Sequence, residues 1–164
     1  ATDLIDNFQN IYEDKWLRMM RDKLGLFGEE KKDKKLITDL LDWMEKNKAD
    51  YTNTFCYLMD MPIKDKIYND KTFIEWVQAW NNRSNLNSSN KENQFQLMKK
   101  VNPVIIPRNH KVEEALSDAD KNNYGSLYKL LSVIQNPYSF KADAFDFQSP
   151  APFTNDKYMT FCGT

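Results

Sequence analysis

The chain has 164 residues, which is enough for one domain with its own hydrophobic core. Lys and Arg total 23 against 24 for Asp and Glu, and the resulting net charge of −1 gives no electrostatic basis for binding nucleic acid. No apolar run approaches the ~20 residues that a membrane span requires, so neither a nucleic acid nor a membrane is an expected partner. With only 4 glycines, helices are favoured over hairpins, and a glycine-rich phosphate-binding loop is not expected.

The apolar spacing along the chain predicts seven helices and no strands. In the first, an i, i+3, i+4 pattern that includes Phe8, Ile11, Tyr12, Trp16 and Met20 predicts one buried face. The predicted helices cover residues 3–24, 30–48, 52–60, 70–82 and 91–100, then one from about 109 and one over 123–135. No stretch shows the alternation of period two that indicates a strand.

Local signals mark several helix ends. Asp3 is a candidate N-cap of the first helix, and Gly25 with Gly28 is expected to end it. Asp50 begins a turn typical of a capped helix start. The polar stretch 81–93 is expected to be a mobile loop. The basic cluster KKDKK at 31–35 is interrupted by an acidic residue, so we expect it to be a solvated helix face.

Residues 137–164 carry seven aromatic side chains but no helical pattern. We expect them to form a mostly irregular tail that packs on the rest of the chain. The predicted fold is therefore all-α, an irregular bundle of about six or seven helices with an extended aromatic C-terminal tail. Residues 1–164 are expected to form a single helical domain.

The stretch VNPVIIPRNHKVEEAL, residues 101–116, contains the single histidine, His110. Pro103 and Pro107 forbid a continuous helix here, because proline lacks an N–H and clashes with the preceding turn. A catalytic role for His110 would need a nucleophile signature nearby, and none is present. We interpret five residues of this stretch as a structural hinge or an interdomain contact. They are Asn102, Pro103, Arg108, Asn109 and His110.

Other site chemistry finds little support in the sequence. One histidine and two distant cysteines, Cys56 and Cys162, cannot supply the three or four close ligands of a zinc-type site. The phosphate-binding and kinase loop motifs are missing. Cys56 lies in an apolar helix and is expected to be a small core residue, whereas Cys162, two residues from the end, is either an incidental thiol or a redox-active one.

The cellular location follows from the same residues. Two cysteines are too few for a disulfide framework, and the start ATDLIDNFQ lacks the features of a secretory signal. A reducing, cytoplasmic location is therefore expected. Because the sequence lacks an initiator Met, we also expect that it was processed or is part of a longer protein.

Five stretches in order resemble the C-terminal region of the selenoprotein O family, protein adenylyltransferases with a pseudokinase fold. They are Met20-Arg21-Asp22-Lys23-Leu24-Gly25-Leu26, Asp50-Tyr51-Thr52-Asn53-Thr54-Phe55, Val101-Asn102-Pro103 with Ile106-Pro107-Arg108-Asn109, Leu130-Leu131 with Gln135-Asn136-Pro137-Tyr138, and Phe161-Cys162-Gly163-Thr164. Together they span nearly the whole chain. Two positions depart from the family pattern: Cys56 stands where arginine is usual, and His110 where tyrosine or tryptophan is also common.

The resemblance implies that the chain is the C-terminal part of a longer enzyme, which moves AMP from ATP to Ser, Thr or Tyr hydroxyls of proteins. ATP and a divalent metal, Mg or Mn, would be bound by the kinase-like part upstream, so no catalytic, cofactor-binding or metal-binding residue is carried onto this chain. The expected partners are that missing N-terminal domain and the protein substrates. Cys162 is carried over as a candidate redox residue. The alternative is a free-standing helical module that binds a protein partner and has no enzymatic activity.

Overall fold

The computed structural model describes residues 7–86, 90–139 and 145–151, and in these ranges the chain is all-α, as predicted. All seven predicted helices are present there, together with a short 3-10 helix, η1, and a four-residue helix, α9, that the sequence did not indicate. In chain order the elements are α2 (Phe8–Lys23), α3 (Asp33–Asn47), α4 (Tyr51–Leu58), η1 (Lys66–Asn69), α5 (Lys71–Asn85), α6 (Lys91–Val101), α7 (Asn109–Asp120), α8 (Gly125–Ile134) and α9 (Phe145–Gln148).

The helix ends follow the local signals. Gly25 and Gly28 have φ of 64° and 69° and end α2 as expected, because glycine adopts the left-handed region without strain. Asp50 caps α4 by accepting a hydrogen bond from the N–H of Asn53 at 2.8 Å. Asp70 caps α5 in the same way through the N–H of Phe73 at 3.1 Å. The predicted cap Asp3 lies outside the described residues.

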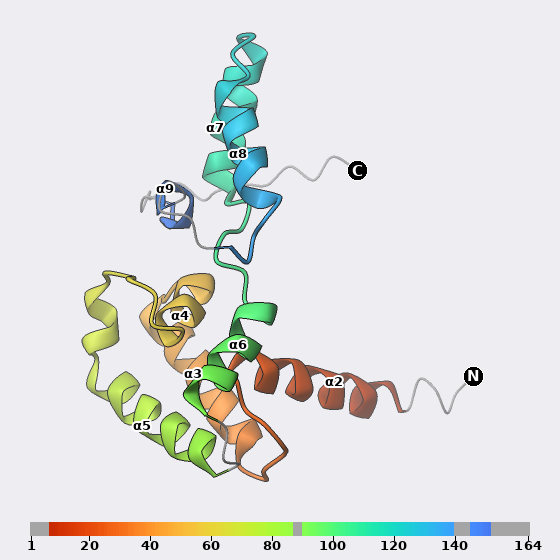
Figure 1. The fold of residues 1–164 in the computed structure, drawn as a ribbon, viewed down its shortest axis with the longest axis vertical. Helices are drawn as coiled ribbons and strands as arrows, with labels where there is room; N and C mark the ends of the chain where they lie inside the picture. The colour runs from red at the N-terminus through yellow and green to blue at the C-terminus, as the bar shows by residue number, and fades with distance from the viewer. Residues whose placement is uncertain (1–6, 87–89, 140–144, 152–164) are drawn as a thin grey trace.

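Helices α3, α4, α5 and α6 form the body of the molecule, and their facing sides enclose its core (Figure 1). Trp43, Phe73, Trp76 and Trp80 are buried there and pack ring against ring. Each indole N–H has an acceptor; Trp76, for example, donates to the carbonyl of Leu36 at 2.8 Å. The large aromatic side chains are thus buried without leaving a polar group unpaired.

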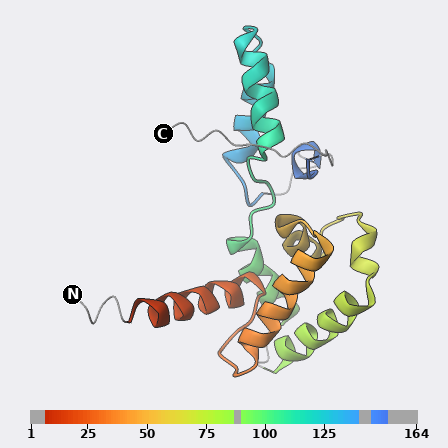
Figure 2. The same ribbon diagram turned by 180° about the vertical axis from the view of Figure 1, so that it is seen from behind.

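Two arms extend from this body (Figures 1 and 2). Helix α2 packs on α3 and α6 through its C-terminal half and projects away through its N-terminal half. Helices α7 and α8 pair as an antiparallel hairpin that projects in another direction. No helix in the described ranges has the length and apolar character needed to cross a membrane.

Three predictions about burial were wrong. Asp33 lies in the stretch expected to be a solvated face, but it is 1% exposed because it pairs with Arg83. Phe8, Ile11 and Tyr12 were expected on a buried face, but their side chains are 65%, 43% and 60% exposed, because no described element covers that side of α2. The loop expected over 81–93 begins later: α5 continues to Asn85, and Arg83 and Ser84 are buried.

Candidate functional site

Residues 102–108, which we call the connector, join α6 to α7 and bring three distant parts of the chain together. Asn102 is fully buried and donates from Nδ2 to the carbonyl of Lys23, at the end of α2, at 2.8 Å. The N–H groups of Val104 and Ile105 both donate to the carbonyl of Pro137, at 2.7 and 3.2 Å. The connector therefore holds the end of α2, the body and the segment after α8 at one junction.

Arg108, the last residue of the connector, binds the helix cap of α4. Its Nη1 and Nη2 donate to the two carboxylate oxygens of Asp50, at 2.7 and 3.0 Å, and Nη2 also lies 3.4 Å from Oδ1 of Asn53. The Arg108 side chain is 8% exposed and that of Asp50 is 22% exposed. A two-pronged pair of this kind fixes orientation as well as distance, so it fastens the start of α7 to the start of α4.

The electrostatics of Asp50 follow from these contacts. Desolvation by partial burial would raise the pKa of its carboxyl group. The hydrogen bonds from Arg108 and from the N–H of Asn53, together with the charge of Arg108, outweigh that effect and hold the pKa of Asp50 below its usual value. Asp50 is therefore ionised at neutral pH and serves both as a cap and as one half of an ion pair.

The other predicted residues of this stretch lie at its margin. Asn109 is exposed and begins α7, and His110 is half-buried beside it. Desolvation, and after it the charges of Lys111 and Arg108, lower the pKa of His110. The imidazole is therefore neutral near pH 7 and adds no charge to those of Lys111 and Arg108.

Helix α9 completes the junction and was missed by the sequence analysis. Asn53 donates from Nδ2 to the carbonyl of Gln148 at 3.2 Å, and Gln148 donates from Nε2 to the carbonyl of Val104, also at 3.2 Å. Phe147 is buried, with the ammonium groups of Lys111 and Lys129 at 5.9 and 5.7 Å from its ring. Its four residues are too few for a periodic signal, so only the aromatic content of the tail indicated that this segment packs.

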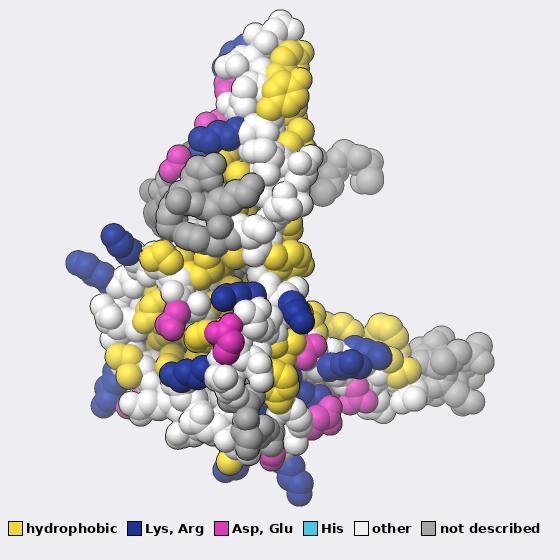
Figure 3. Space-filling view, viewed as in Figure 1, with side chains coloured by type: hydrophobic (Ala, Val, Ile, Leu, Met, Phe, Trp, Pro, Cys, Tyr) yellow, Lys and Arg dark blue, Asp and Glu magenta, His cyan; other side chains and the backbone are white. Residues whose placement is uncertain are grey.

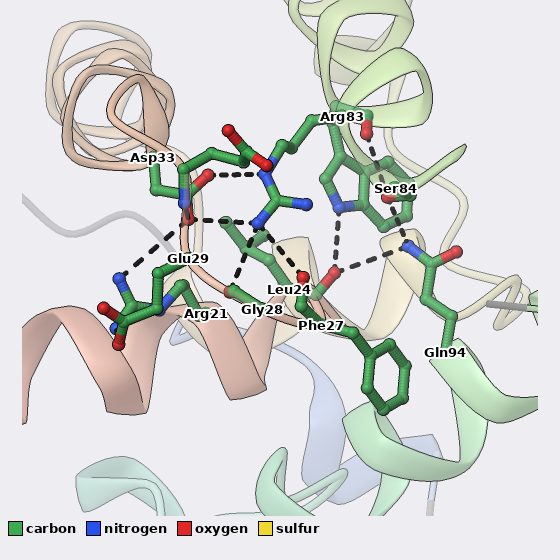
Figure 4. Close-up of polar contacts among 11 residues, drawn as sticks. Arg21, Leu24, Phe27, Gly28, Glu29, Asp33, Arg83, Ser84 and Gln94 are labelled. Atoms are coloured by element: carbon green, nitrogen blue, oxygen red, sulfur yellow. Dashed lines mark hydrogen bonds and ion pairs between the residues drawn. The ribbon is translucent and has the colours of Figure 1, made fainter. Parts of the chain in front are cut away.

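A second polar cluster, centred on Arg83 and Asp33, lies on the body (Figure 4). Asp33 accepts hydrogen bonds from Nε and Nη2 of Arg83, at 2.6 and 3.1 Å. Nη2 also donates to the carbonyls of Phe27 and Gly28, at 3.2 and 3.3 Å. Arg83 is 7% exposed and Asp33 is 1% exposed, so this pair is buried and ties α5 to the turn that precedes α3.

Neighbouring groups extend the cluster across three helices. Trp80 donates its indole N–H to the carbonyl of Leu24 at 2.9 Å, and Gln94 of α6 donates to Oγ of Ser84 at 2.9 Å (Figure 4). The sequence contained a signal for this cluster that was not used. Phe73, Trp76, Trp80 and Arg83 continue one helical stripe, so the core face of α5 runs one turn into the stretch expected to be a loop.

The described residues include one cysteine, Cys56. Cys56 is buried, as predicted, and desolvation, followed by the negative charge of Asp50, raises the pKa of its thiol to about 11. A protonated, buried thiol is a poor nucleophile. Within the described ranges no three or more His, Cys, Asp or Glu residues gather into a possible metal site. Cys162, the predicted redox residue, lies outside the described residues.

Comparison with known proteins relates the whole chain to one family. The family described as protein adenylyltransferase SelO matches residues 2–135. The protein nucleotidyltransferase YdiU of Pelagibacter ubique is 46% identical over 165 residues, and those of Bacillus cereus and Nitrosococcus oceani are 45% and 42% identical over 166 residues. Each match covers 100% of this chain but 34% of the relative, so the chain spans about a third of the length of these curated relatives.

Proposed function

The chain belongs to the SelO family of protein adenylyltransferases, and from this premise we propose that it is the C-terminal helical region of an enzyme that transfers AMP from ATP to Ser, Thr and Tyr hydroxyls of proteins. The observation that carries the proposal is the 46% identity over all of this chain and 34% of a protein nucleotidyltransferase. The part of the enzyme that binds ATP and Mg or Mn lies outside these 164 residues. Within the enzyme this region is a scaffold without catalytic residues.

The connector is the centre of this scaffold. Arg108 binds the cap of α4 and Asn102 binds the end of α2, while the segment after α8 accepts two hydrogen bonds from the connector. We propose that Asn102, Pro103, Arg108, Asn109 and His110 act as a structural hinge that sets how the α7–α8 hairpin stands on the body. These contacts support a role in shape rather than in nucleotide binding.

Cys162 is proposed as a redox switch of the whole enzyme, which would act in the reducing cytoplasm. The basis is the resemblance of Phe161-Cys162-Gly163-Thr164 to the family's C-terminal ending. Cys162→Ser in the full-length enzyme is expected to alter the response of AMP transfer to oxidant, because the reactive thiol is gone. Activity is measured before and after peroxide treatment, with Cys56→Ser as the matched control. An identical oxidant response in wild type and Cys162→Ser would reject the switch.

The enzyme proposal is tested on the longer protein that contains this chain. The purified protein is incubated with ATP labelled on the α-phosphate, with Mg or Mn and with a mixture of cell proteins, and label on protein is measured. Label from the α-phosphate but not from the γ-phosphate is expected, because AMP and not phosphate is transferred. Label from the γ-phosphate alone, or no label under any of these conditions, would overturn the proposal.

A free-standing interaction module is the second candidate, and the exposed aromatic side chains of α2 are the observation in its favour. The two candidates differ in the size of the native gene product. An antibody against this chain should detect a protein about three times longer in the source cells if the chain is a region of the enzyme. A band at 19.4 kDa would instead support the module.

A further inference from the structure

The outer side of α2 carries an apolar stripe that the fold of this chain leaves uncovered. Phe8, Ile11, Tyr12 and Met19 are 65%, 43%, 60% and 47% exposed. At 3.6 residues per turn their side chains fall within an arc of about 100°. The rings of Phe8 and Tyr12 stack on each other with centroids 6.3 Å apart. This stripe is separate from the side chains through which α2 joins the core, such as the fully buried Met20.

The α7–α8 hairpin carries a second uncovered stripe. Tyr124, Tyr128 and Leu131 are 46%, 67% and 40% exposed, and their spacing of four and three residues places them on one side of α8. The rings of Tyr124 and Tyr128 pack with centroids 6.4 Å apart. Each arm of the molecule thus presents an aromatic pair to its surroundings.

The two arms enclose an open angle, and hydrophobic side chains gather along both of its sides (Figure 3). In that view they line the edge of the hairpin and the edge of α2 that faces it. The molecule is hollowed between the arms, so hydrophobic side chains of both arms can contact one convex body at the same time (Figure 3). Exposed apolar residues that gather in a patch mark interaction sites, whereas those scattered singly over a surface are normal.

The N-terminal half of α2 also needs support from outside. All described residues from Asn7 to Tyr12 are exposed. A helical segment of this length that packs on nothing is marginal in water, because helix formation gains its stability in proteins from a buried face. An occupant of the angle would supply that face.

We propose that the angle between α2 and the α7–α8 hairpin seats the rest of the enzyme's own polypeptide. This inference rests on the proposed function, in which the chain is one region of a longer protein. The relatives extend over about twice as many further residues as this chain covers, since the chain is 34% of their length. That polypeptide is large enough to fill the angle, and its matching surface should be apolar, with gaps that accept tyrosine and phenylalanine rings.

The test measures side-chain exposure in the full-length protein by hydroxyl-radical footprinting with mass spectrometry. Tyr12 and Tyr128 are expected to react at least about ten-fold more slowly than free tyrosine, although each is 60% or more exposed in this chain. Leu86 and Ile74, which are 67% and 45% exposed and lie on α5 or at its end, serve as controls. They are expected to keep the reactivity of exposed residues.

A pair of matched variants gives the second readout. A double variant that combines Tyr12→Asp and Tyr128→Asp should lower the melting temperature of the full-length protein by at least about 5 °C, because each substitution places a charge in the docked surface. Leu86→Asp with Ile74→Asp should lower it by less than about 2 °C. Equal shifts for the two pairs would overturn the proposal.

Further outcomes distinguish a failure of the docking proposal from a failure of the proposed function, and they identify other occupants of the angle. Fast oxidation of Tyr12 and Tyr128 in a protein that transfers AMP would overturn the docking surface and leave the function standing. If the protection of Tyr12 and Tyr128 disappears on dilution, the occupant is a second copy of the protein. If it disappears when residues 152–164 are deleted, the occupant is the tail. Either result would overturn the proposal. Protection that survives both supports it, whether or not AMP transfer is detected.

Discussion

Removal of the Arg108 guanidinium should destabilise the protein by a predictable amount. Arg108→Ala deletes two short hydrogen bonds to the carboxylate of Asp50, at 2.7 and 3.0 Å, and a longer one to Asn53. The carboxylate that remains is 22% exposed, so water can hydrate it only in part. The variant therefore loses an ion pair and leaves a partly buried charge.

The magnitude follows from that geometry. Loss of one partner of a fully buried ion pair costs about 3–5 kcal/mol, and a single hydrogen bond to a charged group contributes about 1.5–3 kcal/mol. Asp50 lies between these limits because it is partly exposed and keeps its bond to the N–H of Asn53. We expect Arg108→Ala to lower the free energy of unfolding by about 2–3 kcal/mol, which corresponds to about 5–10 °C for a chain of this size.

Urea denaturation followed by tryptophan fluorescence measures this change. Arg108→Lys keeps the charge but not the planar fork, so it should lose about half as much stability. Arg18→Ala removes an exposed arginine of α2 and should change the free energy of unfolding by less than about 0.5 kcal/mol. If Arg108→Ala were as stable as Arg18→Ala, the ion pair would contribute nothing and the reasoning would be refuted.

The pH dependence gives an independent check. The pKa of Asp50 is lower in the folded state than in the unfolded state, so its contribution to stability is present above the unfolded pKa of about 3.9 and is lost as the pH falls through the folded pKa. Arg108→Ala removes the main interactions that lower this pKa. The difference in stability between wild type and variant should be full at pH 7 and should shrink below about pH 4. A constant difference down to pH 2 would contradict this account.

Three further changes test other parts of the fold. Arg83→Ala should cost about 3 kcal/mol in urea denaturation, because it removes the main partner of a carboxylate that is 1% exposed and leaves it only Arg21, at 3.9 Å, and the N–H of Glu30. Gly25→Ala should cost about 2–4 kcal/mol in the same assay, because φ at this position is +64° and the new Cβ would lie 2.5 Å from Cγ of Gln94. An unchanged urea midpoint would contradict this prediction and show that α6 can move away. The third test measures how fast Cys56 reacts with a thiol reagent at pH 8 in a Cys162→Ser background. The reaction should be at least about 100-fold slower in the folded than in the urea-unfolded chain, because burial raises the pKa of the Cys56 thiol to about 11. Equal rates would contradict the place of Cys56 in the core.

The local elements of this protein could be read from the sequence because their causes are local. Asp50 caps a helix through an N–H three residues away, and Gly25 ends one by adopting a left-handed conformation. The apolar period marked all seven longer helices for the same reason, since it depends only on residues one or two turns apart. Helix α9 has four residues and no such period, so it was missed.

The polar clusters were predictable only in part. Arg108 was interpreted as a structural residue without a named partner; Asp50 lies 58 positions away, and Arg83 lies 50 positions from Asp33. Nothing in a single sequence relates residues at such separations, because the pairing depends on how the helices pack. Arg83 was placed in a loop because the stretch 81–93 around it is polar apart from Leu86.

The sequence by itself determined that the chain is helical, approximately where the seven longer helices lie and that Asp50 caps one of them. Tertiary structure alone decided which apolar faces are covered. Phe8 and Tyr12 were predicted to share a buried face with Met20, yet their side chains are 65% and 60% exposed, whereas Met20 is buried. The physical reason is that a helical period shows that a face is apolar, whereas burial requires a neighbour, and for this face no neighbour lies within the described residues.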